Sequence, residues 1–172
     1  APQATRVEQV RMPENLRHDA LEAVFNDASV AAGSIEHRYG EELAILWRFA
    51  NQREAARRGG AAEAEPRAEY SFHVAGDRVR IVRRHRGTPI DRIVSELMIL
   101  VNGAWGRDLA QAGACAIYRV QDRGKVRMST VPSGHEGLGI DSYAWASSPL
   151  RRYVDLVNQR QLIALALGEA QP

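Results

Sequence analysis

Hydrophobic side chains recur every three to four positions in several stretches of the chain, which is the period of an amphipathic helix. The clearest stripe combines Leu43, Leu46, Trp47 and Ala50, with charged side chains elsewhere around the helix. A later stretch also has good end signals, because Thr can cap a helix and Pro is tolerated in its first turn. The pattern predicts helices over residues 16–25, 41–57, 89–110 and 149–167, the third of them capped by Thr88.

Alternating apolar and polar positions predict short strands in much of the remaining chain. Residues 70–74 and 78–82 flank Gly76-Asp77, a dipeptide that favours a tight hairpin turn. Strands are also predicted over 5–12, 115–120 and 126–130, and loops over 27–39 and 131–141. Strands and helices in this order indicate an α+β fold, in which helices pack on an antiparallel sheet.

Length and composition set limits on this picture. The chain has 172 residues, 45% of them hydrophobic, which suffices for one compact domain. Residues 59–67 are linker-like but too short to separate two domains. The single cysteine, Cys115, excludes a disulfide framework and suits a reducing cytoplasm, and we expect it to be buried. The longest apolar-rich stretch, 93–105, is too short to span a bilayer, so no membrane partner is expected.

The formal net charge is only +2, but the positive charge is clustered and consists almost entirely of Arg. One run comprises Arg78, Arg80, Arg83, Arg84 and Arg86. On a strand, the first two share one face, and a one-sided basic face suits a polyanion backbone. The alternative is an ordinary solvated run of charges.

The segment before the last predicted helix concentrates candidate chemistry. Ser148 is placed to cap that helix and Pro149 to open it, which would put Arg151 and Arg152 in the first turn. Cations fit poorly at the positive end of a helix dipole, whereas a bound phosphate would compensate them. The alternative is a solvated pair in which Arg151 bonds Asp155 one turn later.

Two further ionisable residues are candidates. Glu96 is predicted among aliphatic neighbours in a helix, where a carboxylate must find a partner or take up a proton. The structural alternative is an ion pair with Arg92, and the functional one is a carboxylate that orients a nucleic-acid sugar or a metal-bound water. His135 has no companion His or Cys at ligand spacing, so no zinc site is expected there.

Four segments together resemble the ribonuclease II-like (RNB) exoribonuclease family, in the second half of its catalytic domain. The most specific is Ser-Pro-Leu-Arg-Arg-Tyr at 148–153, followed by Asp155. Upstream come similar segments at 93–102, 116–120 and 135–139, in the family's order. The resemblance covers about residues 40–168 and implies an incomplete RNB catalytic domain.

The resemblance implies a processive, metal-dependent 3′→5′ hydrolase of single-stranded RNA that releases nucleoside monophosphates. It gives Arg151 the catalytic role of gripping the scissile phosphate and Glu96 the role of a carboxylate near the terminal nucleotide. The candidate RNA contacts are Tyr143, Ser147, Ser148, Arg152, His135, Arg78 and Arg80.

The family's aspartate cluster, which holds two magnesium ions, lies in the first half of the domain and has no counterpart in this sequence. We therefore expect the Mg²⁺ ligands outside this chain, on the missing N-terminal half of the domain in the same or a separate chain. Alone, the chain should not cleave RNA. The alternatives are a non-catalytic RNA-binding or scaffolding remnant of the same domain, and a small domain unrelated to RNA.

Overall fold

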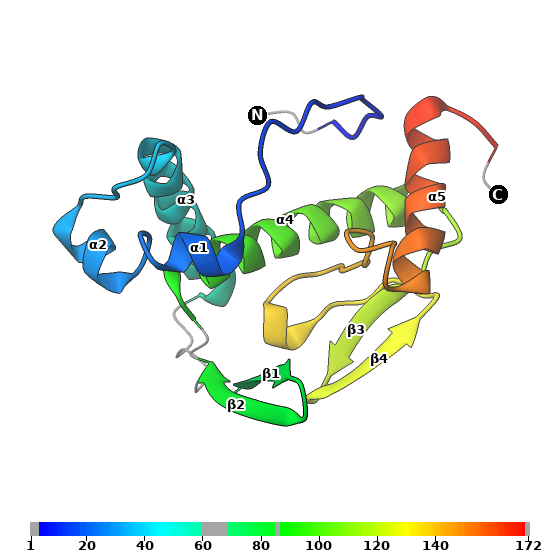
Figure 1. Cartoon of the computed structure of the whole chain (residues 1–172). Coiled ribbons are helices and arrows are strands. Elements are labelled where there is room, and N and C mark those ends of the chain that lie inside the picture. The colour runs from blue at the N-terminus through cyan, green and yellow to red at the C-terminus, as the bar shows by residue number, and fades with distance from the viewer. Residues whose placement is uncertain (1–3, 60–68, 85–86, 171–172) are drawn as a thin grey trace. The chain divides into compact units, whose positions relative to one another are not determined.

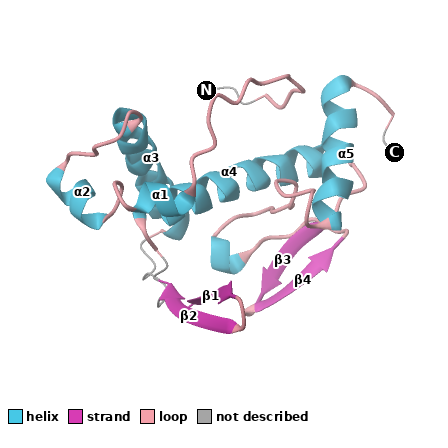
Figure 2. Ribbon diagram, in the orientation of Figure 1, coloured by secondary structure: helices cyan, strands magenta, loops and turns pink. Residues whose placement is uncertain are grey.

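The computed structural model describes residues 4–59, 69–84 and 87–170 (Figure 1). It is an α+β structure, as predicted, but its strands form two separate two-stranded antiparallel sheets (Figure 2). The elements are α1 (His18–Glu22), α2 (Asp27–Ala32), α3 (Gly40–Arg58), β1 (Glu69–Ala75), β2 (Arg78–Arg84), α4 (Pro89–Gln111), β3 (Tyr118–Asp122), β4 (Lys125–Ser129), the 3₁₀ turn η1 (Glu136–Leu138) and α5 (Tyr153–Leu167).

The chain divides into two compact units. One is Glu14–Glu96, and the other combines Leu97–Pro172 with Ala1–Pro13. The division falls within α4 and not at the linker-like stretch 59–67, of which all but the first residue lies outside the described part. None of the helices in the described ranges combines the length and the hydropathy that crossing a membrane requires.

In the first unit, α3 confirms the predicted amphipathic helix. Leu43 and Ala50 from its stripe are buried. The Trp47 ring meets the buried Phe25 ring edge-on, with centroids 6.3 Å apart, which is a favourable arrangement for two aromatic rings. The helix predicted over 16–25 is much shorter, because only His18–Glu22 is helical.

The loop predicted over 27–39 contains a helix instead. Asn26 caps α2, since its side chain accepts hydrogen bonds from the N–H groups of Ala28 and Ser29 at 3.1 and 3.2 Å. Gly33 ends the helix in the left-handed conformation, with φ of 66°. These end signals outweigh the weak hydrophobic period of a six-residue segment.

The hairpin of β1 and β2 is confirmed, and its register pairs Phe72 with Ile81 and His73 with Arg80. Alternation therefore sorts the two strands into an apolar face and a polar face. The apolar face is exposed and carries Tyr70, Phe72, Val74, Val79 and Ile81.

The second unit is built around a core that joins α4, β3 and α5. Tyr118 and Val120 of β3 are buried against Leu109 of α4 and Leu162 of α5, together with two alanines of the segment before α5. Gly106 lets α4 approach that segment closely. A Cβ atom there would lie 2.7 Å from Ser142 Oγ, so even alanine would force a shift.

Four further predictions about this unit need correction. Residues 5–12 form no strand and are exposed, since no neighbouring strand pairs with them in the described part of the chain. β3 begins at Tyr118 and not at residue 115, and Cys115 is exposed. The last helix begins at Tyr153 and not at Pro149.

Candidate nucleic-acid interface

A tight turn carries the paired arginines and leads directly into α5, with Arg152 as the N-cap residue of the helix. The backbone oxygen of Ser148 accepts hydrogen bonds from the N–H groups of Arg151 at 3.2 Å and Arg152 at 3.1 Å. Ser148 therefore does not cap α5, and neither arginine lies in its first turn. The acid in that turn is Asp155, which suits the positive end of the helix dipole.

Asp155 organises the turn from inside. Its side chain is fully buried, and Oδ1 accepts hydrogen bonds from the backbone N–H of Ser148 and from the Arg152 guanidinium, both at 2.7 Å. The alternative in which Arg151 bonds Asp155 is thus wrong, because the neighbouring Arg152 takes that place. Oδ2 has no hydrogen-bond partner within the described residues. The two hydrogen bonds to Oδ1 are therefore the ones that stabilise this buried carboxylate.

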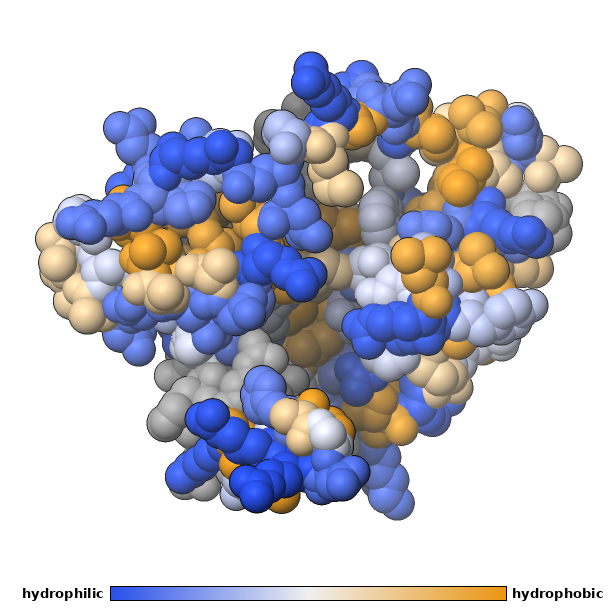
Figure 3. Space-filling model, viewed as in Figure 1, coloured by the Kyte–Doolittle hydropathy of each residue, from blue (hydrophilic) through white to orange (hydrophobic). Residues whose placement is uncertain are grey.

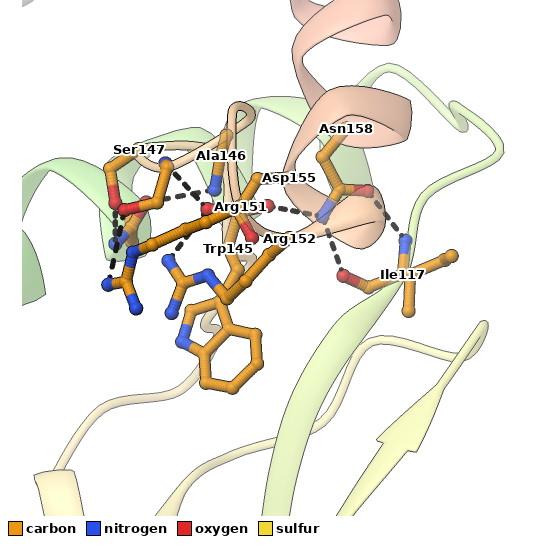
Figure 4. A network of polar contacts seen from close by, with 10 residues as sticks. Ile117, Trp145, Ala146, Ser147, Arg151, Arg152, Asp155 and Asn158 are labelled. Atoms are coloured by element: carbon orange, nitrogen blue, oxygen red, sulfur yellow. Dashed lines mark hydrogen bonds and ion pairs between the residues drawn. The ribbon is translucent and has the colours of Figure 1, made fainter.

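Arg151 is exposed and makes no ion pair within the described parts of the chain. Its one contact is from Nη2 to Ser148 Oγ at 3.5 Å, the outer limit of a hydrogen bond. Figure 4 shows the Arg151 and Arg152 guanidinium groups on the same side, away from α5. The donors of Arg151 are therefore available to an anion, while Arg152 is fixed.

Trp145 lies beneath this pair and was not singled out from the sequence. The Arg152 Cζ atom lies 4.1 Å from the Trp145 ring centroid, and the Arg119 Cζ atom lies 5.0 Å from it. Both distances fit cation–π contacts, which favour a guanidinium over the indole face. The alternation of Tyr143, Trp145 and Ser147 was the available signal, since alternate residues of an extended segment share one side.

Two buried asparagines fix the extended segment that leads into the turn. Asn158 of α5 bonds both backbone groups of Ile117 and the carbonyl of Trp145, each at 2.8 Å (Figure 4). Asn102 of α4 accepts from the Ala146 N–H at 3.2 Å and donates to Ser147 Oγ at 3.3 Å. Each element around the turn is thus tied to it by specific hydrogen bonds.

His135 and Tyr143 are buried beside this segment. Their rings meet edge-on with centroids 5.9 Å apart, and Arg119 Nη1 lies 3.2 Å from His135 Nε2. Burial, followed by the charge of Arg119, lowers the pKa of His135, while a backbone hydrogen bond opposes the shift. A pocket of about 400 Å³ beside His135 is lined partly by Asp122 and Glu136, whose charge would repel phosphate. RNA contacts by His135 and Tyr143 stay predictions.

Glu96 belongs to the other compact unit and is also buried. It forms an ion pair with Arg57 of α3, whose Nε donates to Oε2 at 3.3 Å and whose Nη2 bonds Oε1. Arg92, the partner in the structural alternative, has its Nε atom 3.4 Å from Glu54 and its guanidinium over the Trp47 ring. Both partners are buried, so this pair has a structural role in its unit, and a role near RNA stays a prediction.

The basic strand is described in part. Arg78 and Arg80 lie on β2, exposed, and share the polar face of the hairpin with His73. Arg83 falls on the other face, opposite Tyr70. Arg86 lies outside the described residues.

The carboxylates near the arginine turn do not fit a two-magnesium site. Asp155 is committed to Ser148 and Arg152, and Asp141 lies 3.3 Å from Arg107. Across the described ranges, the one group of three or more potential metal ligands is His18, Glu22 and Asp91, in the other unit. The residues described here therefore provide no counterpart of an aspartate cluster.

Comparisons with known proteins identify the family of this chain. The family model described as "RNB domain" matches residues 9–127 and 123–168. Exoribonuclease 2 of Aeromonas hydrophila is 40% identical over 72 residues, covering 34% of this chain and 11% of the relative. Human "3'-5' exoribonuclease HELZ2" is 44% identical over 63 residues, covering 37% of this chain and 2% of the relative. The chain thus spans a small fraction of these relatives' length.

Solved structures show the same fold. Dss1 exoribonuclease from Candida glabrata superposes with a TM-score of 0.71 at 17% identity, over 83% of this chain and 23% of that one. Mycoplasma genitalium RNase R, solved with ribose-methylated single-stranded RNA, gives a TM-score of 0.63 at 14% identity. The superposition covers 87% of this chain and 32% of the RNase R chain. Because the family model matches nearly the whole chain and the fold agrees, the chain belongs to the RNB domain family.

Proposed function

We propose that this chain is the phosphate-gripping part of a processive 3′→5′ exoribonuclease that hydrolyses single-stranded RNA to nucleoside monophosphates. Its relatives named as exoribonucleases support the reaction class. The RNase R structures with double-stranded and with single-stranded RNA support RNA as the substrate class.

The observation that carries the proposal is the contrast between two adjacent arginines. Arg152 is fixed by Asp155, whereas exposed Arg151 has only one long contact with a neighbouring hydroxyl. A planar guanidinium with free donors can bond two phosphate oxygens at once. Arg151 is therefore the residue assigned to the scissile phosphate, where a fixed positive charge would stabilise the charge of phosphoryl transfer.

The surroundings of Arg151 fit a nucleic-acid strand. Ser147 and Ser148 add hydroxyl groups at the same turn, and Trp145 adds an aromatic face beside two guanidinium groups. Phosphate contacts and aromatic stacking are the two means by which proteins bind single strands without sequence preference. In this proposal Arg152 and Trp145 position the strand, and Arg78 and Arg80 contact its backbone elsewhere.

The Mg²⁺ ions that such hydrolysis uses would be held by residues outside this chain. This assignment follows from the carboxylates described above, which are engaged in other contacts. No catalytic step is therefore expected from the isolated chain, and the complementary first half of the RNB domain is its required partner.

The experiment compares Arg151→Lys with the wild type in a protein that joins this chain to the first half of an RNB domain. Lysine keeps the charge but loses the two-pronged contact, so turnover of single-stranded RNA with Mg²⁺ should fall by a factor on the order of 100 or more. Arg160→Lys is the matched control, because Arg160 is exposed on α5 and lies outside the turn. Equal turnover of Arg151→Lys and wild type would refute the assignment.

The second candidate is a non-catalytic RNA-binding remnant. The observation that favours it is that the carboxylates described near Arg151, those of Asp155 and Asp141, are engaged in other contacts. In that case the joined protein would bind RNA without cleaving it, and Arg151→Lys would cost no more than one phosphate contact. Measuring binding and cleavage on the same samples separates the two functions.

A further inference from the structure

Three side chains that the proposed function does not use converge in the unit Glu14–Glu96. His18 and Glu22 are one turn apart on α1, and Asp91 lies in the first turn of α4. His18 Nε2 lies 3.0 Å from Glu22 Oε1 and 3.2 Å from Asp91 Oδ1. One ligand atom from each residue lies within 4.8 Å of the other two.

These distances are close to those within a metal coordination sphere. Zinc binds His nitrogen at about 2.0–2.1 Å and carboxylate oxygen at about 2.0–2.2 Å. In a tetrahedral arrangement, two such ligand atoms are separated by roughly 3.4 Å. Small rotations of the His18, Glu22 and Asp91 side chains would therefore suffice to admit an ion among them.

The donor set also selects a class of ion. An imidazole nitrogen with two carboxylates suits Zn²⁺ and other first-row divalent metals, whereas Mg²⁺ prefers oxygen ligands alone. The two carboxylates would balance the charge of a divalent ion. The side chains are 33%, 32% and 23% exposed for His18, Glu22 and Asp91, so solvent can reach the group and an ion can enter.

The Thr88 hydroxyl forms hydrogen bonds with both segments that carry the carboxylates. Its hydroxyl donates to Glu22 Oε1 at 3.1 Å and accepts the Asp91 N–H at 3.3 Å. Partners of this kind orient metal ligands and are part of a functioning site. One hydroxyl thus links the end of α1 to the start of α4.

We propose that His18, Glu22 and Asp91 bind a divalent transition-metal ion of the Zn²⁺ type, with water completing the coordination. The ion would join α1 to α4 within this unit. α1 has five residues and no side-chain cap at its start, so it gains little stability from its own hydrogen bonds. The site does not depend on the proposed nuclease function, because it uses none of the residues assigned to RNA.

The test is titration of the purified chain with Zn²⁺ by isothermal calorimetry. We expect one equivalent to bind, with affinity reduced about 100-fold in His18→Gln. His73→Gln is the matched control, because His73 is exposed on β1 and belongs to no ligand group in the described ranges. Zn²⁺ should raise the Tm of the wild type and of His73→Gln but not of His18→Gln.

Circular dichroism checks that each variant is folded, and Glu22→Gln replaces His18→Gln if the latter is not. A large excess of Mg²⁺ should not displace the zinc. A wild-type chain that takes up no Zn²⁺ would overturn the proposal. Equal zinc affinities of the His18 or Glu22 variant and of His73→Gln would overturn it too, because the ion would then bind elsewhere.

Discussion

Asp155 accepts a hydrogen bond from the Arg152 guanidinium at 2.7 Å, three residues back along the chain, and so leaves the adjacent Arg151 without a carboxylate partner among the residues that the structure describes. One buried carboxylate therefore divides two consecutive arginines into a structural residue and a residue available for binding. The same oxygen accepts the Ser148 N–H, so it also fixes the shape of the turn.

Asp155→Ala should destabilise the chain, because it leaves the Ser148 N–H and one face of Arg152 without their acceptor. The Arg152 side chain is 24% exposed and can regain some water, so we expect a loss of about 2 kcal/mol in the free energy of unfolding. Urea denaturation measures this loss. Arg151→Ala is the control and should change stability by less than about 0.5 kcal/mol. A similar effect of both variants would contradict the division of roles.

Asn158→Asp tests the three bonds that connect α5 to the core of its unit. The Asn158 amide nitrogen donates to the carbonyls of Ile117 and Trp145, both at 2.8 Å. An oxygen in its place would face two carbonyl oxygens in a buried site, so we expect a loss of more than about 2 kcal/mol. Thermal unfolding followed by circular dichroism measures it. Gln159→Glu, a similar change on a half-buried position of α5, should cost much less.

His135 predicts a dependence of stability on pH. Its pKa in the folded chain lies below 6.5, because burial and the charge of Arg119 disfavour the protonated form. Well above pH 6.5 both folded and unfolded chains hold this residue neutral, and its contribution is constant. As the pH is lowered towards and below 6.5, the unfolded chain binds the proton before the folded chain does. The free energy of unfolding therefore decreases as the pH decreases.

The measurement is urea denaturation of wild type and His135→Gln between pH 7.5 and pH 5. The variant should lose less stability over this range than the wild type does. His73→Gln serves as the control, since His73 is exposed on β1. Identical pH profiles for the His135 variant and the wild type would rule out the predicted contribution.

The polar face of the β1–β2 hairpin predicts a salt effect on RNA binding. If Arg78 and Arg80 each contact a phosphate, the double alanine variant should bind single-stranded RNA more weakly. The slope of log K against log salt should also decrease in magnitude by about 1.4, or about 0.7 for each contact. Fluorescence anisotropy at several salt concentrations measures this slope. Arg83→Ala, on the opposite face of the same hairpin, should leave it nearly unchanged.

The longer elements of the fold, which have a regular hydrophobic pattern, were predictable from the sequence. α3, α4 and the β1–β2 hairpin were placed to within a residue or two, because stripes, caps and turn residues agree there. The short α2 was missed because an Asn26 capping box, and not a hydrophobic period, defines it. The strand expected over 5–12 failed because alternation alone supplies no pairing partner.

At the candidate site the local geometry differs from the one that the motif predicted. Ser148-Pro149 is a strong signal for the start of a helix, yet the Ser148 carbonyl closes a turn first and α5 begins at Tyr153. The alternative that paired Arg151 with Asp155 failed for this reason, since it required a helix that places Arg151 one turn before Asp155. The contact between Trp145 and Arg119 joins residues 26 positions apart, which local spacing cannot show.

The arginines of the β1–β2 hairpin would have a second effect besides the RNA binding proposed for them. Its apolar face and unpaired strand edges could join with those of another molecule, which is how exposed edges initiate aggregation. Repulsion among Arg78, Arg80 and Arg83 on neighbouring molecules opposes this association. Salt screens both the repulsion between these arginines and their attraction to phosphate. Rising ionic strength should therefore weaken RNA binding and favour self-association of the protein.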